Sequence, residues 1–196
     1  YRVVKIVVAY PGVDNRYYSN KRDLNAKNIL AIGNVIERKG YSVLIEALAD
    51  IKSDWHLNII GKFSSNDPYY QTLIEKIHQY KLSDNIKFLG NIPEANKMRI
   101  MLDSKIFVLP TFYEGFGISL VEATALGLNI ITSDLPVLRE VLKGGQTQFI
   151  PINDNKKLSA AIEKTLLNRS ELSNSKIQNY RWRSTAKTFK RRLHVN

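Results

Sequence analysis

The 196-residue sequence contains no cysteine and only three histidines, His56, His78 and His194, which stand far apart. The lack of cysteine excludes disulfides, thiolate metal ligands and cysteine nucleophiles. The histidine spacing does not match that of a metal site. No Asp-x-Asp pair occurs that could hold a divalent metal against a diphosphate. We therefore expect no bound metal.

Long hydrophobic runs are missing too. No apolar stretch approaches the roughly 20 residues that a membrane-spanning helix needs, and no signal-peptide pattern opens the chain. A hydrophobic content of 44% and a charged content of 24% are typical of a globular protein. Together with the absence of cysteine, these features favour a cytoplasmic protein whose length allows one full core.

Acidic residues are absent from the last 25 residues, which contain seven of the 29 lysines and arginines. The whole chain has a net charge of +11, so most of the excess lies in this tail. From Ser170 onward the tail predicts a basic amphipathic helix, in which Trp182, Ala186, Phe189 and Leu193 share one face. Such a face is either solvated or attracted to anionic lipid at the inner membrane surface, at about 1 kcal/mol per cation. We expect no nucleic-acid binding, because the basic residues are not spread over a domain.

Short apolar runs alternate with segments of helical period through most of the chain, which predicts βαβ units and a parallel sheet. The fold class is therefore α/β, a Rossmann-like parallel sheet with helices on both faces. The expected strands are Lys5–Ala9, Asn28–Ile32, Leu57–Ile60, Ile86–Leu89, Ile106–Leu109, Asn129–Thr132 and Gln148–Ile150. The expected helices are Tyr41–Ile51, Pro68–Tyr80, Ala95–Asp103, Ser119–Leu126, Val137–Leu142 and Lys156–Leu167.

The most informative stretch joins the strand Ile106–Leu109 to the helix Ser119–Leu126 through a glycine-bearing turn. Gly115 and Gly117 let the backbone approach a ligand closely. The N–H groups of Ile118 and Ser119 stand at the positive end of the helix dipole, where a diphosphate binds well.

Glu122 lies about five residues into this helix, roughly 7 Å from its start, where the ribose of a bound nucleotide would lie. Its two oxygens can accept hydrogen bonds from both vicinal hydroxyls. A structural alternative remains, because Ser119-x-x-Glu122 is also the sequence of a capping box.

Glu114 and Glu122 bracket the turn as an E-x7-E element. Six further segments, before and after it in the chain, agree with one family pattern in order and spacing. These are Pro11-Gly12-Val13-Asp14, Gly33 to Gly40 ending Arg38-Lys39-Gly40, Phe88-Leu89-Gly90, Pro110-Thr111, Asp134 with Glu140, and Gly144-Gly145. In these motifs the chain resembles the C-terminal, donor-binding domain of retaining glycosyltransferases of family 4 (glycosyl transferases group 1), which have the GT-B fold of two facing Rossmann-like domains.

The resemblance implies roles for individual residues. Glu114 would approach the donor sugar, and Lys39 would stabilise the departing diphosphate. Relatives usually carry arginine where this chain has Asn34, so one cation of the expected pair is missing unless Arg38 turns inward. The residues that would bind substrate are Gly33, Asn34, Arg38, Ile92 (near the base), Gly115, Phe116 (more a packing anchor than a stacking platform), Gly117, Ile118, Ser119 and Glu122.

The resemblance also implies a domain organisation. Residues 1–26 would form an interdomain linker and first strand, 27–170 the nucleotide-sugar-binding domain, and 171–196 a helix that packs toward an N-terminal domain absent from this chain. The implied function is transfer of a hexose from a UDP or GDP sugar to a saccharide or lipid-linked acceptor, without a cofactor. Two alternatives remain open, a non-catalytic nucleotide-sugar-binding or interaction module and half of an epimerase or phosphorylase.

Overall fold

The computed structural model describes residues 10–18, 27–168, 180 and 182–193 of the chain. Its helices are η1 (Asn15–Tyr18), η2 (Glu37–Lys39), α1 (Tyr41–Ala49), α2 (Pro68–Gln79), α3 (Glu94–Leu102), α4 (Ile118–Ala125), α5 (Pro136–Val141), α6 (Asn155–Leu167) and α7 (Trp182–Leu193). Its strands are β1 (Asn28–Ile32), β2 (His56–Ile60), β3 (Ile86–Gly90), β4 (Ser104–Leu109), β5 (Asn129–Ser133) and β6 (Thr147–Ile150). The strand expected at Lys5–Ala9 lies outside the described residues.

The six strands form one parallel sheet in the order β3-β2-β1-β4-β5-β6. The central strands β1 and β4 read NILAI and SKIFVL, apolar runs that suit burial on both faces. The Rossmann-like parallel sheet expected from the alternating pattern is thus confirmed, and each strand expected among the described residues is found within two residues of its predicted bounds.

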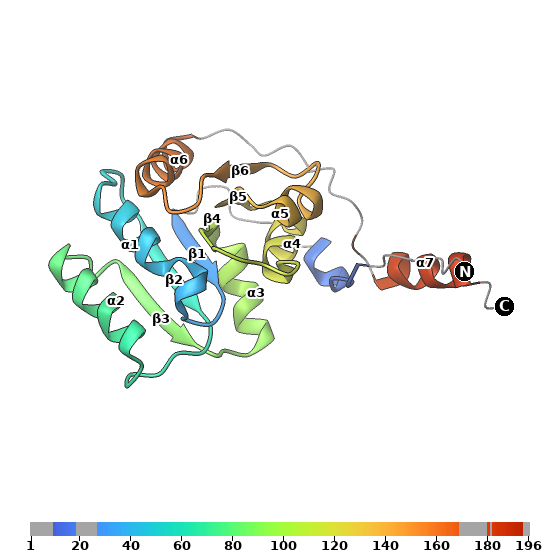
Figure 1. Cartoon of the computed structure of the whole chain (residues 1–196), viewed down its shortest axis with the longest axis horizontal. Coiled ribbons are helices and arrows are strands. Elements are labelled where there is room, and N and C mark those ends of the chain that lie inside the picture. Colours follow the sequence, from blue (N-terminus) through green and yellow to red (C-terminus); the bar gives the residue numbers. More distant parts are fainter. Residues whose placement is uncertain (1–9, 19–26, 169–179, 181, 194–196) are drawn as a thin grey trace, which may run out of the picture.

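Helices cover both faces of the sheet (Figure 1), as the alternation of strands and helices predicted. On one face α1, α2 and α6 pack against alternate strand residues such as Ile29, Ala31 and Val108. On the other face η1, α3, α4 and α5 pack against the intervening residues, among them Leu30 and Phe107. The period of two along each strand therefore divides the core into two layers.

Because all strands run in one direction, the loops that follow them meet at a single edge, where ligands bind in open α/β sheets. The turns after β1, β2 and β3 are joined by hydrogen bonds, from Gly33 N–H to Ile60 O (2.8 Å) and from Gly61 N–H to Gly90 O (3.0 Å). Gly61 has φ +150°, and a Cβ there would lie 2.1 Å from Gly33 O. This edge is consequently a rigid, closely packed platform.

The basic tail is helical over α7, as expected, and α7 extends away from the body (Figure 1). Trp182, at its first residue, is 61% exposed. Thr185 Oγ1 donates to Tyr10 O at 2.8 Å, which ties α7 to the start of the chain. Within the described residues, no helix is both long and apolar enough to cross a bilayer.

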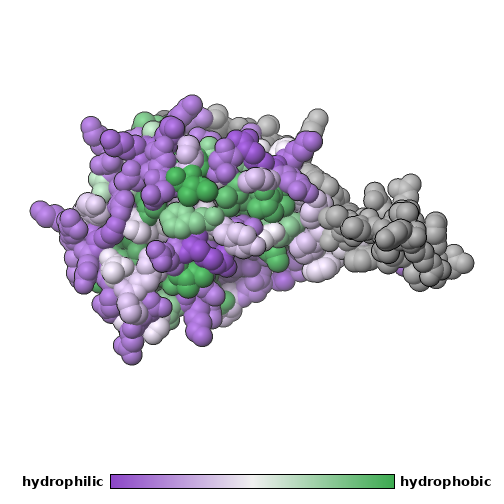
Figure 2. Space-filling view, in the orientation of Figure 1, coloured by the Kyte–Doolittle hydropathy of each residue, from purple (hydrophilic) through white to green (hydrophobic). Residues whose placement is uncertain are grey.

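The face shown in Figure 2 is mostly hydrophilic. In Figure 2 apolar side chains gather near the middle of the visible face, within a hydrophilic surround. Large hydrophobic residues that remain exposed include Ile36, Tyr113 and Ile118, which lie in loops and at a helix start on the carboxyl edge of the sheet. Exposed apolar groups at an edge where ligands bind direct attention to that edge.

Candidate functional site

The helix α4 begins at Ile118, directly after Gly117, whose φ of +81° favours glycine. No side chain caps this end. Ser119 instead donates its hydroxyl to Ile32 O at 3.4 Å, so the capping-box alternative is wrong. The first helical N–H groups that have a backbone acceptor are those of Leu120 and Val121, which both donate to Gly117 O. Within the described chain, the N–H groups of Ile118 and Ser119 have no backbone acceptor. Both remain available to an anion.

Access to this helix end is open. Ile118 is 49% exposed. Among the described residues, a Cβ on Gly115 would meet no atom within 4 Å. A ligand atom can therefore approach the backbone closely at Gly115.

Lys39 and Glu114, the residue before Gly115, form an ion pair through Lys39 Nζ and Glu114 Oε1. The two side chains are only 11% and 10% exposed. Lys39 ends η2, and a Cβ on Gly33 would lie 3.2 Å from the Lys39 Cε, so Gly33 leaves room for the lysine stem. The two residues predicted to be catalytic, 75 positions apart in sequence, are thus in direct contact.

Arg38 and Asn34 are both engaged by neighbouring loops. The exposed Arg38 donates from Nη1 to Tyr113 O at 3.0 Å. Asn34 accepts the Lys62 N–H on its Oδ1 at 3.3 Å. Arg38 therefore connects η2 to the turn after β4 through its guanidinium.

The turn after β4 is fixed to η2 by two further contacts. Phe112 N–H donates to Arg38 O at 2.7 Å. The buried Thr111 hydroxyl lies 2.9 Å from the carbonyl oxygens of both Arg38 and Tyr113. These bonds hold Glu114 in register with Lys39, so the pair is set by backbone geometry as well as by charge.

Glu122 is paired with a residue that sequence reasoning missed. Lys97, on α3, places its Nζ 3.0 Å from Glu122 Oε2 and 3.0 Å from Glu94 Oε2. The Lys97 and Glu122 side chains are 17% and 13% exposed. The hydroxyl of the buried Tyr17 donates to Glu94, and Lys97 Nζ lies 5.4 Å from the centre of the Tyr17 ring.

The pKa values of Glu122 and Glu94 are shifted in opposite directions by these surroundings. Burial raises the pKa of Glu122 above its usual range, although Lys97 opposes the shift. Burial also acts to raise the pKa of Glu94, but the hydrogen bonds from Tyr17 and Lys97 outweigh it and hold that pKa below its usual value. Lys97 is therefore the main group that favours the charged form of Glu122.

The remaining predicted residues lie at the margins of this site. Phe116 stacks on Tyr10 with ring centres 5.8 Å apart and meets Tyr180 edge-on at 5.5 Å, so its ring takes part in protein packing. Ile92 follows β3, is partly buried and packs against the α3–α5 layer. In the part of the chain that the structure describes, no group of three His, Asp or Glu side chains could hold a metal ion.

The chain was compared with known protein families and with known proteins. The family model described as "Glycosyl transferases group 1" matches residues 17–183. Phosphatidyl-myo-inositol mannosyltransferase of Mycobacterium leprae is 33% identical over 148 residues, covering 72% of this chain and 38% of the relative. The putative colanic acid biosynthesis glycosyltransferase WcaL of Escherichia coli K12 is 29% identical over 170 residues, covering 79% and 40%. The chain thus spans about two fifths of these relatives.

Solved structures show the same fold. Anabaena Alr3699/HepE in complex with UDP superposes with a TM-score of 0.84 at 18% identity, over 95% of this chain and 56% of that one. The same protein with UDP and glucose gives 0.83 at 18% identity, over 96% and 56%. The chain therefore corresponds to one half of a two-lobed structure.

Proposed function

Because this chain belongs to the glycosyl transferases group 1 family, we propose that it is the donor-binding lobe of a retaining hexosyltransferase. The donor is a UDP or GDP sugar, and the acceptor is a saccharide or a lipid-linked hydroxyl. The carrying observation is the open amino end of α4, with the Lys39–Glu114 pair beside it and Glu122 one turn further along the helix. The relatives named above carry mannosyltransferase and glycosyltransferase names, which supports this class of reaction.

The diphosphate would bind at the N–H groups of Ile118 and Ser119. An anion at a helix start gains both hydrogen bonds and the favourable dipole. Lys39 would then turn from Glu114 toward the leaving phosphate, which gains negative charge as the sugar departs. Glu114 would be freed to accept hydroxyls of the donor sugar, so the ion pair holds both groups ready before the donor arrives.

The ribose would bind at Glu122. This carboxylate must be charged to accept from both ribose hydroxyls, and burial opposes that charge. Lys97 supplies the counter-charge, and its second partner Glu94 lets it shift without losing every contact. We propose Lys97 as a positioning residue for the ribose carboxylate.

The domain organisation is proposed on the same grounds. Residues 27–170 bind the donor, while residues 1–26 and 171–196 connect to a preceding lobe that supplies the acceptor site. The half-length coverage of the structural relatives supports this division. The basic helix α7 would bring the enzyme to an anionic membrane surface at the inner face, where lipid-linked acceptors lie.

Calorimetric titration with UDP, GDP and ADP tests donor binding. Glu122→Gln should weaken the preferred nucleotide about tenfold, the order expected for losing hydrogen bonds to a charged group. Glu75→Gln, an exposed carboxylate on α2, is the matched control and should change nothing. Equal loss in both variants, or no nucleotide binding at all, would refute the proposal.

A second candidate is a non-catalytic nucleotide-sugar-binding module. It is favoured by the loop contacts of Asn34 and Arg38, which leave Lys39 to neutralise the diphosphate. We expect the chain alone to transfer negligible sugar. Adding the complementary N-terminal lobe of a family member should restore transfer if the chain is an enzyme half. Tight nucleotide binding without transfer would favour the module.

A further inference from the structure

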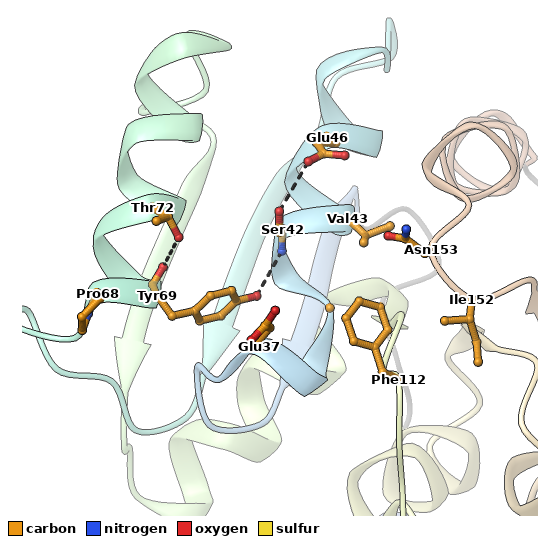
Figure 3. A pocket seen from close by; sticks show the side chains of 11 residues that line it. Glu37, Ser42, Val43, Glu46, Pro68, Tyr69, Thr72, Phe112, Ile152 and Asn153 are labelled. Atoms are coloured by element: carbon orange, nitrogen blue, oxygen red, sulfur yellow. Dashed lines mark hydrogen bonds between the residues drawn. The ribbon is translucent and has the colours of Figure 1, made fainter.

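A second cavity, of about 750 Å³, opens on the α1, α2 and α6 side of the molecule (Figure 3). Its walls come from η2, the starts of α1 and α2, the turn after β4 and the loop before α6. A volume of this order is typical of small-molecule sites. None of the residues that line it belongs to the proposed donor site.

The walls combine aromatic rings with hydrogen-bonding groups. Tyr69 reaches in from α2 and Phe112 from the turn after β4, with Glu37 between them (Figure 3). Ser42, Thr72 and Asn153 also line the cavity. The Thr72 hydroxyl donates to Tyr69 O at 2.7 Å. Among the residues that the structure describes, no lysine or arginine lines it, in a chain with a net charge of +11. A phosphate would therefore meet carboxylates without a lining cation to offset them.

The two carboxylates of the cavity differ in their partners. Glu46 is held by Lys76, by the Ser42 hydroxyl at 3.4 Å and by the Asn155 amide at 3.2 Å. Within the described residues, Glu37 has no ion pair and accepts no side-chain hydrogen bond, and it is exposed. Lys76 offsets the charge of Glu46, so Glu37 is the carboxylate that is left to accept hydroxyl donors from a ligand.

From this chemistry we propose that the cavity binds a hexose unit of a saccharide. The Glu37 carboxylate would accept from two vicinal hydroxyls. The Tyr69 hydroxyl accepts the Ser42 N–H at 3.3 Å, which leaves its own proton to donate, and the Asn153 amide adds further donors. The rings of Tyr69 and Phe112 offer apolar surface to the C–H groups of the sugar.

The position of the cavity links it to the donor-binding loops. Glu37 and Gly40 flank Lys39 in sequence, and Phe112 lies two residues before Glu114 while its N–H bonds to Arg38 O. On the proposed function, which this step alone requires, the bound sugar belongs to the acceptor or product chain. The enzyme would then hold a saccharide on the lobe that binds the donor.

Nuclear magnetic resonance titration of the chain tests the cavity directly. The probes are the methyl α-glycosides of mannose, glucose and galactose. At least one should produce saturable shifts of the backbone N–H signals of Ser42, Thr72 and Asn153. Glu37→Gln should weaken that binding about tenfold, as for a lost hydrogen bond to a charged group. Glu75→Gln, also an exposed carboxylate, should leave it unchanged.

A second variant keeps the test sharp. Thr72→Arg changes an exposed position of α2 and should fill the cavity and abolish binding, while the thermal midpoint stays close to that of the parent. Shifts confined to Ile118 and Ser119, or no difference among variants, would overturn the proposal. So would binding of tetramethylammonium at these signals with no glycoside binding. A parallel titration with UDP or GDP reports on Ile118 and Ser119, so failure of donor binding is seen separately.

Discussion

At the scale of single residues, Lys97 forms ion pairs with Glu94 and Glu122 and also lies over the Tyr17 ring. Replacing it with methionine leaves Glu122 partly buried without a counter-charge. We expect Lys97→Met to lower the free energy of unfolding by about 2 kcal/mol, less than for a fully buried pair because some exposure remains. Chemical denaturation measures it, with the exposed helical Lys164→Met as control.

Part of the lost stability should be regained when the unpaired charge of Glu122 is also removed. The double variant Lys97→Met with Glu122→Gln should be more stable than Lys97→Met alone. If the double variant is instead as unstable as the sum of both single variants, the Lys97–Glu122 contact does not carry the energy assigned to it.

The raised pKa of Glu122 predicts how nucleotide binding depends on pH. The carboxyl takes up its proton at a higher pH than an ordinary glutamate, so affinity should begin to fall above the usual carboxyl range as the solution is acidified. The same shift makes Glu122 oppose folding as pH rises through its raised pKa, since the folded state binds the proton more tightly.

Titrations of UDP or GDP across the acidic range check this. Glu122→Gln should flatten the dependence, whereas Lys97→Met should move its midpoint to higher pH. If the midpoint of the pH dependence is unchanged in Lys97→Met, Lys97 does not keep Glu122 charged.

Asn34 offers a gain-of-affinity test. Asn34→Arg supplies the cation that the family resemblance implies at this position, at the cost of the exposed Lys62 contact. We expect nucleoside diphosphates to bind about tenfold more tightly, as for one charge-assisted hydrogen bond. The nucleosides themselves should bind unchanged. Calorimetry with UDP against uridine, or GDP against guanosine, separates these effects, and equal changes for both ligands would count against phosphate contact at this loop.

At the scale of elements, the turn that joins η2 to α1 depends on one glycine. Gly40 has φ +71°, and a Cβ there would lie 2.0 Å from Pro110 O, in the backbone that leads to Glu114. Gly40→Ala should therefore cost about 3 kcal/mol and disturb the Lys39–Glu114 pair. Gly115→Ala is the matched control, because its Cβ would meet nothing within 4 Å and should leave stability nearly unchanged. Thermal unfolding of both variants provides the measurement.

Much of this level could be predicted from the sequence. The strand Ile106–Leu109 could be predicted because it is a short apolar run that is buried on both faces of the sheet. The helix Pro68–Tyr80 could be predicted because its buried residues Leu73 and Ile77 recur at helical spacing. The capping-box alternative at the start of α4 could not be excluded from the sequence, because the tertiary contact of Ser119 with Ile32 O has no local signal.

The candidate site was only partly visible for the same reason. Glu114, Lys39 and Glu122 belong to recognisable motifs, whereas Lys97 is one charged residue of a polar helix. Its contact with Glu122 depends on how α3 packs beside α4. Neither spacing nor composition indicates which lysine of a helix turns toward a neighbouring element.

At the scale of the whole molecule, binding should need no divalent metal. In the proposed site Lys39 and the α4 dipole would supply the positive charge that offsets the diphosphate. At 100 times its dissociation constant, UDP or GDP should stabilise the chain by about 2.7 kcal/mol. Thermal shifts measured with EDTA and with magnesium should agree, and a shift that requires magnesium would contradict this account.

The strand order also has a consequence for how the molecule comes together. The sheet divides into two three-stranded halves, residues 28–90 and 104–150, which meet where β1 lies beside β4. Lys39 belongs to the first half and Glu114, Ile118 and Glu122 to the second. Neither half alone contains all the residues of the proposed donor site, so a bound nucleoside diphosphate would contact both halves and stabilise their association. Two fragments severed between β3 and α3 should thus reassemble more readily when a nucleoside diphosphate is present.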